Sequence, residues 1–290
     1  ERKLILSPLE RMAICCIFFE PSSRTMESFG VAANKLGAFT RNLVGERDGK
    51  TGEWVIPYSS MIKGETFEDT IATLSTFYDA IVIRHPVIGK VAIAADHSVV
   101  PVINGGDGIG EHPTQGLLDL FTIYNELGEV DGKHIVLVGD PKNGRTIHSL
   151  IKILTHYDVK VTIVAPEQLM LQEEYREEAK RAGILKEETT EFERVIPTAD
   201  IVYMTRVQGE RFPNNPEGQA AYERVKDAYI MTPEIMATAK PKMALMHPLP
   251  RKNEIDTRCD ADTRSAYKHR QMRNGLYIRE ALLAAVLGKV

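Results

Sequence analysis

The sequence is poor in cysteine, which argues against a disulfide-stabilised protein and against a cysteine metal site. It holds 3 cysteines in 290 residues, Cys15, Cys16 and Cys259, and their spacing is not that of metal ligands. Because Cys15 and Cys16 lie in an apolar run, we interpret them as buried thiols rather than as part of a disulfide framework. We therefore expect a reducing, cytoplasmic setting and no metal site.

Long apolar runs and a strong excess of one charge are also missing. No run reaches the ~18 residues of a membrane helix, and the N-terminus shows no signal peptide, so no membrane association is predicted. The net charge of −4 gives no general basic surface for nucleic acid. The composition is that of an ordinary globular protein, with 43% hydrophobic and 26% charged residues. The chain of 290 residues is long enough for about two domains.

The sequence does have a regular alternation of apolar runs and amphipathic segments. The runs predict strands at 13–19, 38–44, 80–83, 99–103, 134–138, 159–164, 200–204 and 243–246. The amphipathic segments predict helices at 23–36, 66–78, 89–96, 113–127, 144–156, 167–182 and 275–287. The polar, glycine-rich residues 45–64 are predicted to be a loop.

This alternation predicts an α/β fold with two doubly wound parallel-sheet domains and an active site in the cleft between them. The turn-rich segment 128–132 is the candidate boundary. We expect residues 1–127 and 275–290 to form one domain and residues 128–274 to form the other.

The segment Phe-Phe-Glu-Pro-Ser-Ser-Arg-Thr at 18–25 ends a predicted buried strand and begins a helix. At a helix start the backbone N–H groups lack intrahelical partners and the helix dipole is positive, and Arg24 adds a full charge there. The segment therefore predicts an anion site, most naturally for phosphate. The structural alternative is a serine-capped helix with a solvated arginine.

Arginines gather where the predicted strands end. Five of them follow six strands: Arg24, Arg84, Arg145, Arg206 and Arg251. Guanidinium groups bind phosphates and carboxylates through forked hydrogen bonds, and ligands of doubly wound sheets bind beyond the carboxyl ends of strands. The first half suits a phosphate-bearing donor and the second half a dicarboxylate acceptor, which describes a group-transfer enzyme.

Taken together, the motifs resemble those of the aspartate carbamoyltransferases, also called aspartate transcarbamoylases. Besides 18–25 they are Lys-Gly-Glu-Thr (63–66), Arg-His-Pro (84–86), His-Pro-Thr-Gln (112–115), Val-Gly-Asp (138–140), Gly-Arg-Thr-Ile-His-Ser (144–149), Tyr-Met-Thr-Arg-Val-Gln (203–208) and His-Pro-Leu-Pro-Arg (247–251). The resemblance implies transfer of the carbamoyl group from carbamoyl phosphate to L-aspartate. The products would be N-carbamoyl-L-aspartate and phosphate, in de novo pyrimidine biosynthesis, without a metal or organic cofactor.

The resemblance also implies roles for individual residues. The catalytic residues would be Thr25, Arg84, His112 and Lys63. Carbamoyl phosphate would be bound by Ser22, Ser23, Arg24, Thr25, Ser59, Lys63, Arg84, His112, Gln115, Leu249 and Pro250. Aspartate would be bound by Lys63, Arg145, Arg206 and Gln208. Asp140 is expected to organise loop backbone rather than to act as a base.

The resemblance further implies a homotrimer with active sites shared between subunits. Lys63 and Ser59, with Ser60 as the alternative to Ser59, would reach into the neighbouring site. A larger multienzyme or regulatory assembly stays open, as does the question of a free-standing chain.

Some positions depart from the family pattern. The family usually has threonine at Ser23, where the hydroxyl is kept, and lysine at Gly209, where a charge is lost and flexibility is expected to increase. The motif 247–251 lacks the cysteine expected of an ornithine carbamoyltransferase. Two alternatives remain: a carbamoyltransferase for another amino acid, and a non-catalytic transcarbamoylase-like domain for binding or assembly.

Overall fold

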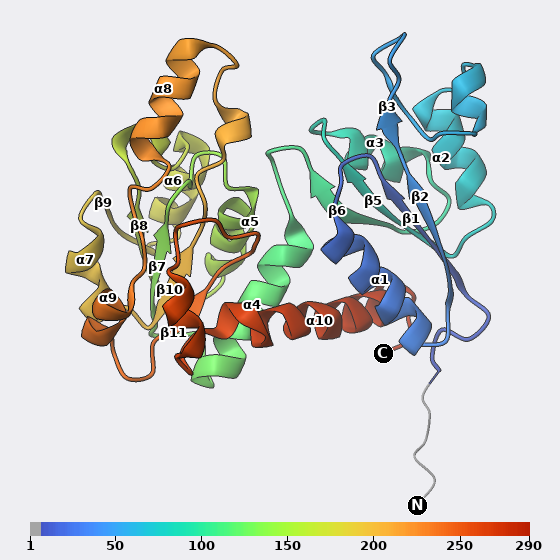
Figure 1. The fold of residues 1–290 in the computed structure, drawn as a ribbon. Coiled ribbons are helices and arrows are strands. Elements are labelled where there is room, and N and C mark those ends of the chain that lie inside the picture. The colour runs from blue at the N-terminus through green and yellow to red at the C-terminus, as the bar shows by residue number, and fades with distance from the viewer. Residues whose placement is uncertain (1–6) are drawn as a thin grey trace, which may run out of the picture. The chain divides into compact units, whose positions relative to one another are not determined.

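The computed structural model describes residues 7–290. The chain forms two compact units, each built on its own parallel sheet (Figure 1). Unit 1 holds the described residues up to Thr114 together with Gly275–Val290, and unit 2 holds Gln115–Asn274. The fold class expected from the alternation of strands and helices is confirmed.

The chain passes between the units inside two helices, α4 (Pro113–Leu127) and α10 (Arg270–Val286). The first passage follows Thr114, whereas the turn-rich segment at 128–132 suggested a boundary after α4. The helix divides in this way because its buried face, including Ile123, packs into the core of unit 2.

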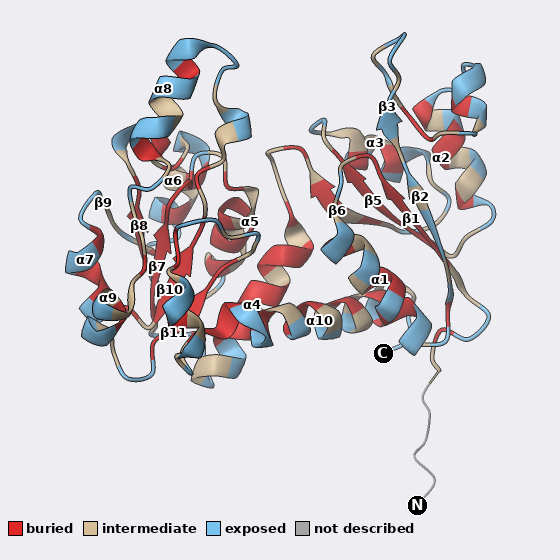
Figure 2. Ribbon diagram, in the orientation of Figure 1, coloured by how far each residue is buried: buried red, intermediate tan, exposed pale blue. Residues whose placement is uncertain are grey.

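The sheet of unit 1 has the strand order β2-β1-β5-β6, with every neighbouring pair parallel. Its strands are β1 (Ala13–Phe18), β2 (Phe39–Val44), β5 (Ala80–His85) and β6 (Val102–Asp107). The central strands β1 and β5 are buried on both faces, which explains the apolar sequence of β1 and of Ala80–Ile83 in β5. Figure 2 shows them red against the exposed edge strand β2.

Helices cover both faces of this sheet. Phe29 of α1 (Ser23–Lys35) and Leu283 of α10 pack on one face. Helices α2 (Phe67–Ser75) and α3 (Lys90–His97) pack on the other. The side chain of Thr66 caps α2 by accepting from Asp69 N at 3.0 Å.

The segment 45–64 is more ordered than the loop expected there. It contains an antiparallel hairpin, β3 (Glu46–Arg47) with β4 (Trp54–Val55), and a 3₁₀ turn at Ser60–Lys63. The Asp48 carboxylate closes the hairpin by accepting from the backbone N–H groups of the turn. Strands of this length leave no periodic signal in a sequence.

The sheet of unit 2 has the order β11-β10-β7-β8-β9 and is also wholly parallel. Its strands are β7 (His134–Val138), β8 (Lys160–Val164), β9 (Leu185–Thr189), β10 (Ile201–Met204) and β11 (Ala244–Met246). Its helices include α5 (Arg145–Leu154), α6 (Glu173–Arg181), α7 (Phe192–Val195), α8 (Pro216–Val225) and α9 (Pro233–Thr238).

Several predicted bounds were wrong. The strand expected at 80–83 continues through Arg84 and His85, and the strand expected at 99–103 is β6, which starts later and includes Asn104–Asp107. The helix expected at 167–182 is a 3₁₀ turn followed by α6, because the extended backbone of Met170 and Gln172 interrupts it. Helix α10 begins at Arg270 rather than at Gly275.

Candidate active site

The strand order of unit 1 creates a topological switch point between β1 and β5. From β1 the chain passes through α1 to β2 on one side, and it later returns to β5 on the other side. Ligands of open parallel sheets bind beyond the carboxyl ends of the two strands at such a point. There the structure places the segment 19–25 and Arg84, because Phe18 pairs with Arg84 in the sheet register and Phe19 N donates to Arg84 O.

The predicted phosphate segment forms the N-terminus of α1. Ser22 is the N-cap residue, and its side chain accepts no capping hydrogen bond. Ser23 and Arg24 are exposed in the first turn, and Thr25 is buried. The backbone N–H groups of this turn and three hydroxyls are thus gathered at the positive end of a 13-residue helix, as an anion site requires.

Arg84 lies at the centre of a buried polar cluster in unit 1. Its Nε is 3.0 Å from the Glu20 carboxylate, and its Nη1 is 3.4 Å from Gly105 O and 3.3 Å from His112 Nε2. Only 8% of Arg84 and 5% of His112 are exposed. A guanidinium group can only donate hydrogen bonds, so His112 Nε2 accepts here and the imidazole proton resides on Nδ1, 3.4 Å from Thr114 Oγ1.

Unit 2 has a second switch point, between β7 and β10. The carboxyl ends of these strands lead into residues 139–145 and 205–208, which contain the residues predicted to bind aspartate. The two loops approach so closely that a Cβ on Gly139 would lie 2.1 Å from Thr205 O, and Gly139 has a φ of +116°. Only glycine fits there.

Asp140 joins the two loops, as the sequence predicted. It is fully buried, and burial raises the pKa of its carboxyl group. Its carboxylate accepts from Asn143 N and from Gln208 N, each at 3.1 Å. Gln208 Nε2 in turn donates to Asn143 O at 2.9 Å, which fixes Gln208 beside Arg145, the first residue of α5.

Arg206 follows β10 and already holds a carboxylate, that of Glu210. Nη1 lies 2.9 Å from Glu210 Oε2, and Nη2 bonds to Oε1. The pair raises the pKa of Arg206, and it lowers the pKa of Glu210 to about 2. The guanidinium plane of Arg206 is therefore presented in the geometry that binds a carboxylate end-on.

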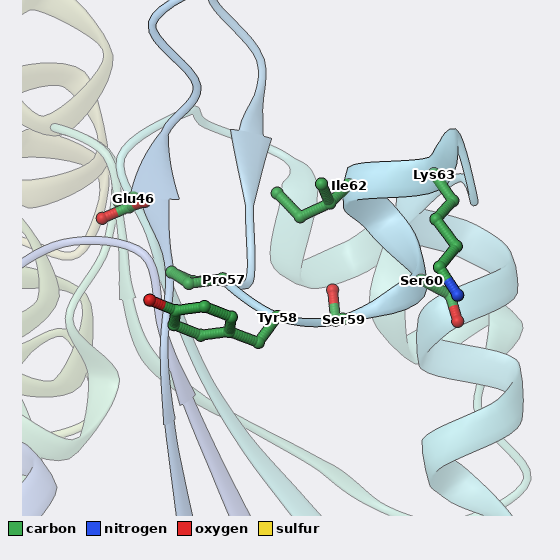
Figure 3. A pocket seen from close by; sticks show the side chains of 7 residues that line it. All are labelled: Glu46, Pro57, Tyr58, Ser59, Ser60, Ile62 and Lys63. Carbon is green, nitrogen blue, oxygen red and sulfur yellow. The ribbon is translucent and has the colours of Figure 1, made fainter.

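The residues around Ser59 and Lys63 line a pocket of about 740 Å³ (Figure 3). Its lining is Glu46, Pro57, Tyr58, Ser59, Ser60, Ile62 and Lys63, and it includes no residue of the Arg84 cluster or of the phosphate segment. The hydroxyl of Ser59 caps the 3₁₀ turn by accepting from Met61 N at 3.2 Å and also donates to Ile56 O at 2.6 Å. Ser60 is exposed, and in Figure 3 the Lys63 side chain extends toward it.

The remaining predicted residues, Gln115, Leu249 and Pro250, belong to unit 2. Gln115 lies in the first turn of α4, where its Nε2 donates to Asp119 Oδ1 at 2.9 Å. Leu249 has a φ of +54°, an unusual value for leucine, and precedes a cis peptide bond to Pro250. Its backbone N–H donates to His247 Nδ1 at 2.7 Å.

Gly209 has a packing role that its sequence did not suggest. A Cβ at this position would lie 2.9 Å from Tyr222 Cζ, so the glycine makes room for an aromatic ring. A positive charge still approaches this region, because Lys252 Nζ lies 3.5 Å from Tyr222 Oη.

Sequence reasoning missed the acidic partners of the predicted residues. Glu20 holds Arg84, Glu210 holds Arg206, and Asp119 holds Gln115. Asp119 did leave a signal, because it is an acidic residue within the buried face of α4 that also carries Leu118. Such a position calls for hydrogen-bond donors nearby.

Within residues 7–290, no group of three or more His, Cys, Asp or Glu side chains is arranged to hold a metal ion. Over the same residues, no helix combines the length and apolar character needed to traverse a bilayer.

Two family models match almost the whole chain. The carbamoyl-P binding domain of aspartate/ornithine carbamoyltransferase matches residues 1–125, and the Asp/Orn binding domain of the same family matches residues 131–286. The chain belongs to the aspartate/ornithine carbamoyltransferase family, and the resemblance drawn from its motifs is confirmed.

Several similar proteins are named as aspartate carbamoyltransferases. The aspartate carbamoyltransferase catalytic subunit of Bacteroides fragilis is 43% identical over 97% of this chain and 86% of its own length. Aspartate transcarbamoylase from Trypanosoma cruzi, solved with carbamoyl phosphate and aspartate, has a TM-score of 0.84 at 39% identity over 96% of this chain and 85% of the other.

A much longer relative is also similar. Multifunctional protein URA2 of Saccharomyces cerevisiae is 48% identical over 99% of this chain, yet the chain spans only 12% of that protein.

Proposed function

We propose that this chain transfers the carbamoyl group of carbamoyl phosphate to the amino group of L-aspartate, giving N-carbamoyl-L-aspartate and phosphate for pyrimidine biosynthesis. The observation that carries the proposal is the set of anion-binding residues at the two switch points. One presents a helix N-terminus with Arg24 beside the buried Arg84–His112 pair, and the other presents Arg145 with Arg206. The first set suits a phosphoryl donor and the second a diacid.

In unit 1, the phosphate of carbamoyl phosphate is bound by the start of α1. Ser22, Ser23, Arg24 and Thr25 supply hydroxyls, backbone N–H groups and one full charge, and Arg84 contacts both the phosphate and the carbamoyl oxygen. The carbamoyl amide is bound by Gln115 and by the backbone of Leu249 and Pro250. Glu20 keeps Arg84 oriented in the absence of substrate.

The reaction forms one bond and breaks one. The α-amine of aspartate attacks the carbamoyl carbon, and the resulting oxyanion is stabilised by Thr25, Arg84 and His112. Each such donor is worth about 3–4 kcal/mol in other enzymes. The bond from carbon to the bridging oxygen then breaks, and the leaving phosphate takes the ammonium proton. His112 donates through Nε2 once the carbamoyl oxygen has replaced its contact with Arg84, which requires the other imidazole tautomer.

In unit 2, the two carboxylates of aspartate are bound by Arg145, Arg206 and Gln208. The end-on pair of Arg206 with Glu210 supports this role, because the guanidinium group of Arg206 binds a carboxylate there. The backbone of Gln208 is fixed by Asp140, which supports a defined position for its side chain.

Ser59 and Lys63 act in the site of a neighbouring subunit of a homotrimer. Their separate, solvent-open pocket supports this assignment, because a loop with its own pocket can serve a second chain. Lys63 then contributes to both substrates. The cytoplasm suits the three buried free thiols, and association into a larger multienzyme agrees with the similarity to multifunctional relatives.

The test is formation of N-carbamoyl-aspartate and phosphate by the purified chain. Product must require both substrates, and ornithine must not replace aspartate at equal concentration. Carbamoylation of ornithine but not of aspartate would give the chain a different acceptor. Tight binding of a phosphonate analogue that joins both substrates, without turnover, would identify a non-catalytic binding domain.

A further inference from the structure

A buried polar network in unit 2 centres on Asp119 of α4. Its Oδ1 accepts from Gln115 Nε2 at 2.9 Å and from Gln271 Nε2 at 2.7 Å, and its Oδ2 accepts from Tyr203 Oη at 2.7 Å. Asp119, Gln271 and Tyr203 are completely buried. Burial and the nearby carboxylate raise the pKa of the Tyr203 phenol well above its usual value, so the hydroxyl keeps the proton that it donates.

This arrangement fixes which way the Gln115 amide faces. A carboxylate can only accept hydrogen bonds, so it must meet the nitrogen of the amide and not the oxygen. The oxygen Oε1 is attached to the same carbon and faces away from the nitrogen. Gln115 therefore offers an acceptor to a ligand, and a carbamoyl NH₂ group is a donor that matches it.

The network also reaches the loop after β11. Gln271 uses its amide nitrogen on Asp119, and its Oε1 accepts from His247 N at 2.9 Å. His247 Nδ1 accepts from Leu249 N at 2.7 Å, so its proton resides on Nε2, which donates to Glu254 Oε1 at 2.7 Å. The chain of hydrogen bonds thus runs from Gln115 to the backbone that turns at Leu249 and Pro250.

We infer that Asp119 and Gln271 are positioning residues that orient both groups proposed to bind the carbamoyl amide, and thereby select carbamoyl phosphate over phosphates that lack an amide. Asp119 touches no substrate in this scheme; it acts through Gln115 directly and through Gln271 on the 247–250 loop. The inference rests on the proposed function for the identity of the ligand. It adds the reason why the site distinguishes a carbamoyl NH₂ from a methyl group.

The test measures equilibrium binding of three ligands to the whole chain: carbamoyl phosphate, acetyl phosphate and inorganic phosphate. The variant Asp119→Leu keeps the branched shape of the side chain and removes both acceptor oxygens. We expect the Kd of carbamoyl phosphate to rise about 10- to 100-fold, the effect of losing one or two oriented hydrogen bonds. The Kd values of acetyl phosphate and inorganic phosphate should stay within about twofold, because the phosphate segment belongs to unit 1 and has no part in the network.

A matched control comes from the next turn of α4. Thr122 is completely buried, accepts from Asn274 Nδ2 at 3.0 Å and donates to Leu118 O at 2.7 Å. Thr122→Val removes a buried hydrogen bond of the same helix, and it should leave the Kd ratio of carbamoyl phosphate to acetyl phosphate unchanged. If it shifts that ratio as Asp119→Leu does, a general loosening of α4 explains the result and the inference fails.

Asp119→Asn provides the conservative variant and decides the question if the leucine variant does not fold. It keeps one acceptor oxygen for three donors, so its selectivity for carbamoyl phosphate should lie between those of the wild type and the leucine variant. Wild-type selectivity in Asp119→Leu, or in Asp119→Asn where only that variant folds, would overturn the inference. An equal loss of affinity for all three ligands would also overturn it. A wild type that binds carbamoyl phosphate selectively without turning it over would refute the proposed activity and leave the inference standing.

Discussion

Arg206 donates to the carboxylate of Glu210 from both terminal nitrogens of its guanidinium group, and Nη1 lies 2.9 Å from Oε2. An end-on pair uses two of the five N–H donors of an arginine, so the others remain for a second carboxylate. Glu210 therefore holds Arg206 in position and need not leave if Arg206 binds a carboxylate of aspartate as proposed.

The variant Glu210→Gln should raise the KM for aspartate by about tenfold, because the neutral amide replaces one charge-assisted contact and leaves the guanidinium free to rotate. Initial rates at saturating carbamoyl phosphate measure it, with Glu223→Gln, an exposed carboxylate of α8, as the control. An unchanged or lower KM would mean that Glu210 competes with substrate instead of orienting Arg206.

The pH dependence of this pair follows from the lowered pKa of Glu210. Its folded-state pKa of about 2 lies below the usual value, so the pair contributes fully above the unfolded pKa, about 4.3, and is lost as the pH falls toward 2. The KM for aspartate should therefore show no titration of Glu210 between pH 6 and 9. A carboxyl titration in that range that disappears in Glu210→Gln would contradict the pairing.

Removing the charge at the start of α1 should weaken the binding of every ligand that carries a phosphate. For Arg24→Ala we expect the KM of carbamoyl phosphate and the inhibition constant of inorganic phosphate to rise together, by about 10- to 100-fold. Lys35→Ala, at the other end of the same helix, is the control, since Lys35 pairs with Glu280. Normal kinetics in Arg24→Ala would refute the phosphate role. The parallel rise of both constants also separates this variant from changes at Asp119.

The sequence predicted the parts of the fold in which burial is complete. Strands β1 and β7 are buried on both faces, so their sequences are unbroken apolar runs that can be recognised without a structure. Strand β9 was missed because its sequence, Leu-Lys-Glu-Glu-Thr, lies at a sheet edge and is mostly polar. The end of β5 was placed too early, because Arg84 and His85 are polar residues buried by their partners in other segments.

The site shows the same division. Residues proposed to contact ligands, such as Arg24 and Arg206, could be selected from the sequence because they follow strands and belong to recognisable motifs. Their partners were not predicted, because a hydrogen bond such as that between Asp119 and Gln271 joins positions 152 residues apart. Only the folded chain brings such pairs together.

The two serines of the 59–63 turn can be separated by substitution. The Ser59 hydroxyl bonds to Ile56 O and Met61 N within its own loop, whereas Ser60 is exposed. If Ser59 contacts the ligand, Ser59→Ala should lower kcat/KM for carbamoyl phosphate by about tenfold while Ser60→Ala stays near wild type. If Ser59 serves only as the cap of the turn and Ser60 contacts the ligand, Ser60→Ala should lower kcat/KM and Ser59→Ala should stay near wild type. Steady-state kinetics on both variants, with thermal unfolding to register the lost cap, decides between them.

Sharing of the site between subunits can be tested by mixing two inactive chains. Lys63→Ala removes the residue proposed to serve the neighbouring subunit, and His112→Ala removes a residue of the chain's own cluster, so each variant alone should be nearly inactive. Random exchange at equal concentrations places an intact Lys63 beside an intact His112 in about a quarter of the sites. Activity should therefore recover to about a quarter of the wild-type value once subunits have exchanged. The control is a mixture of Lys63→Ala with the double variant Lys63→Ala/His112→Ala, which contains no intact pair and must stay inactive. Absence of recovery, with exchange verified by mass spectrometry of differently labelled chains, would place Lys63 and His112 in the same subunit's site or remove Lys63 from the chemistry.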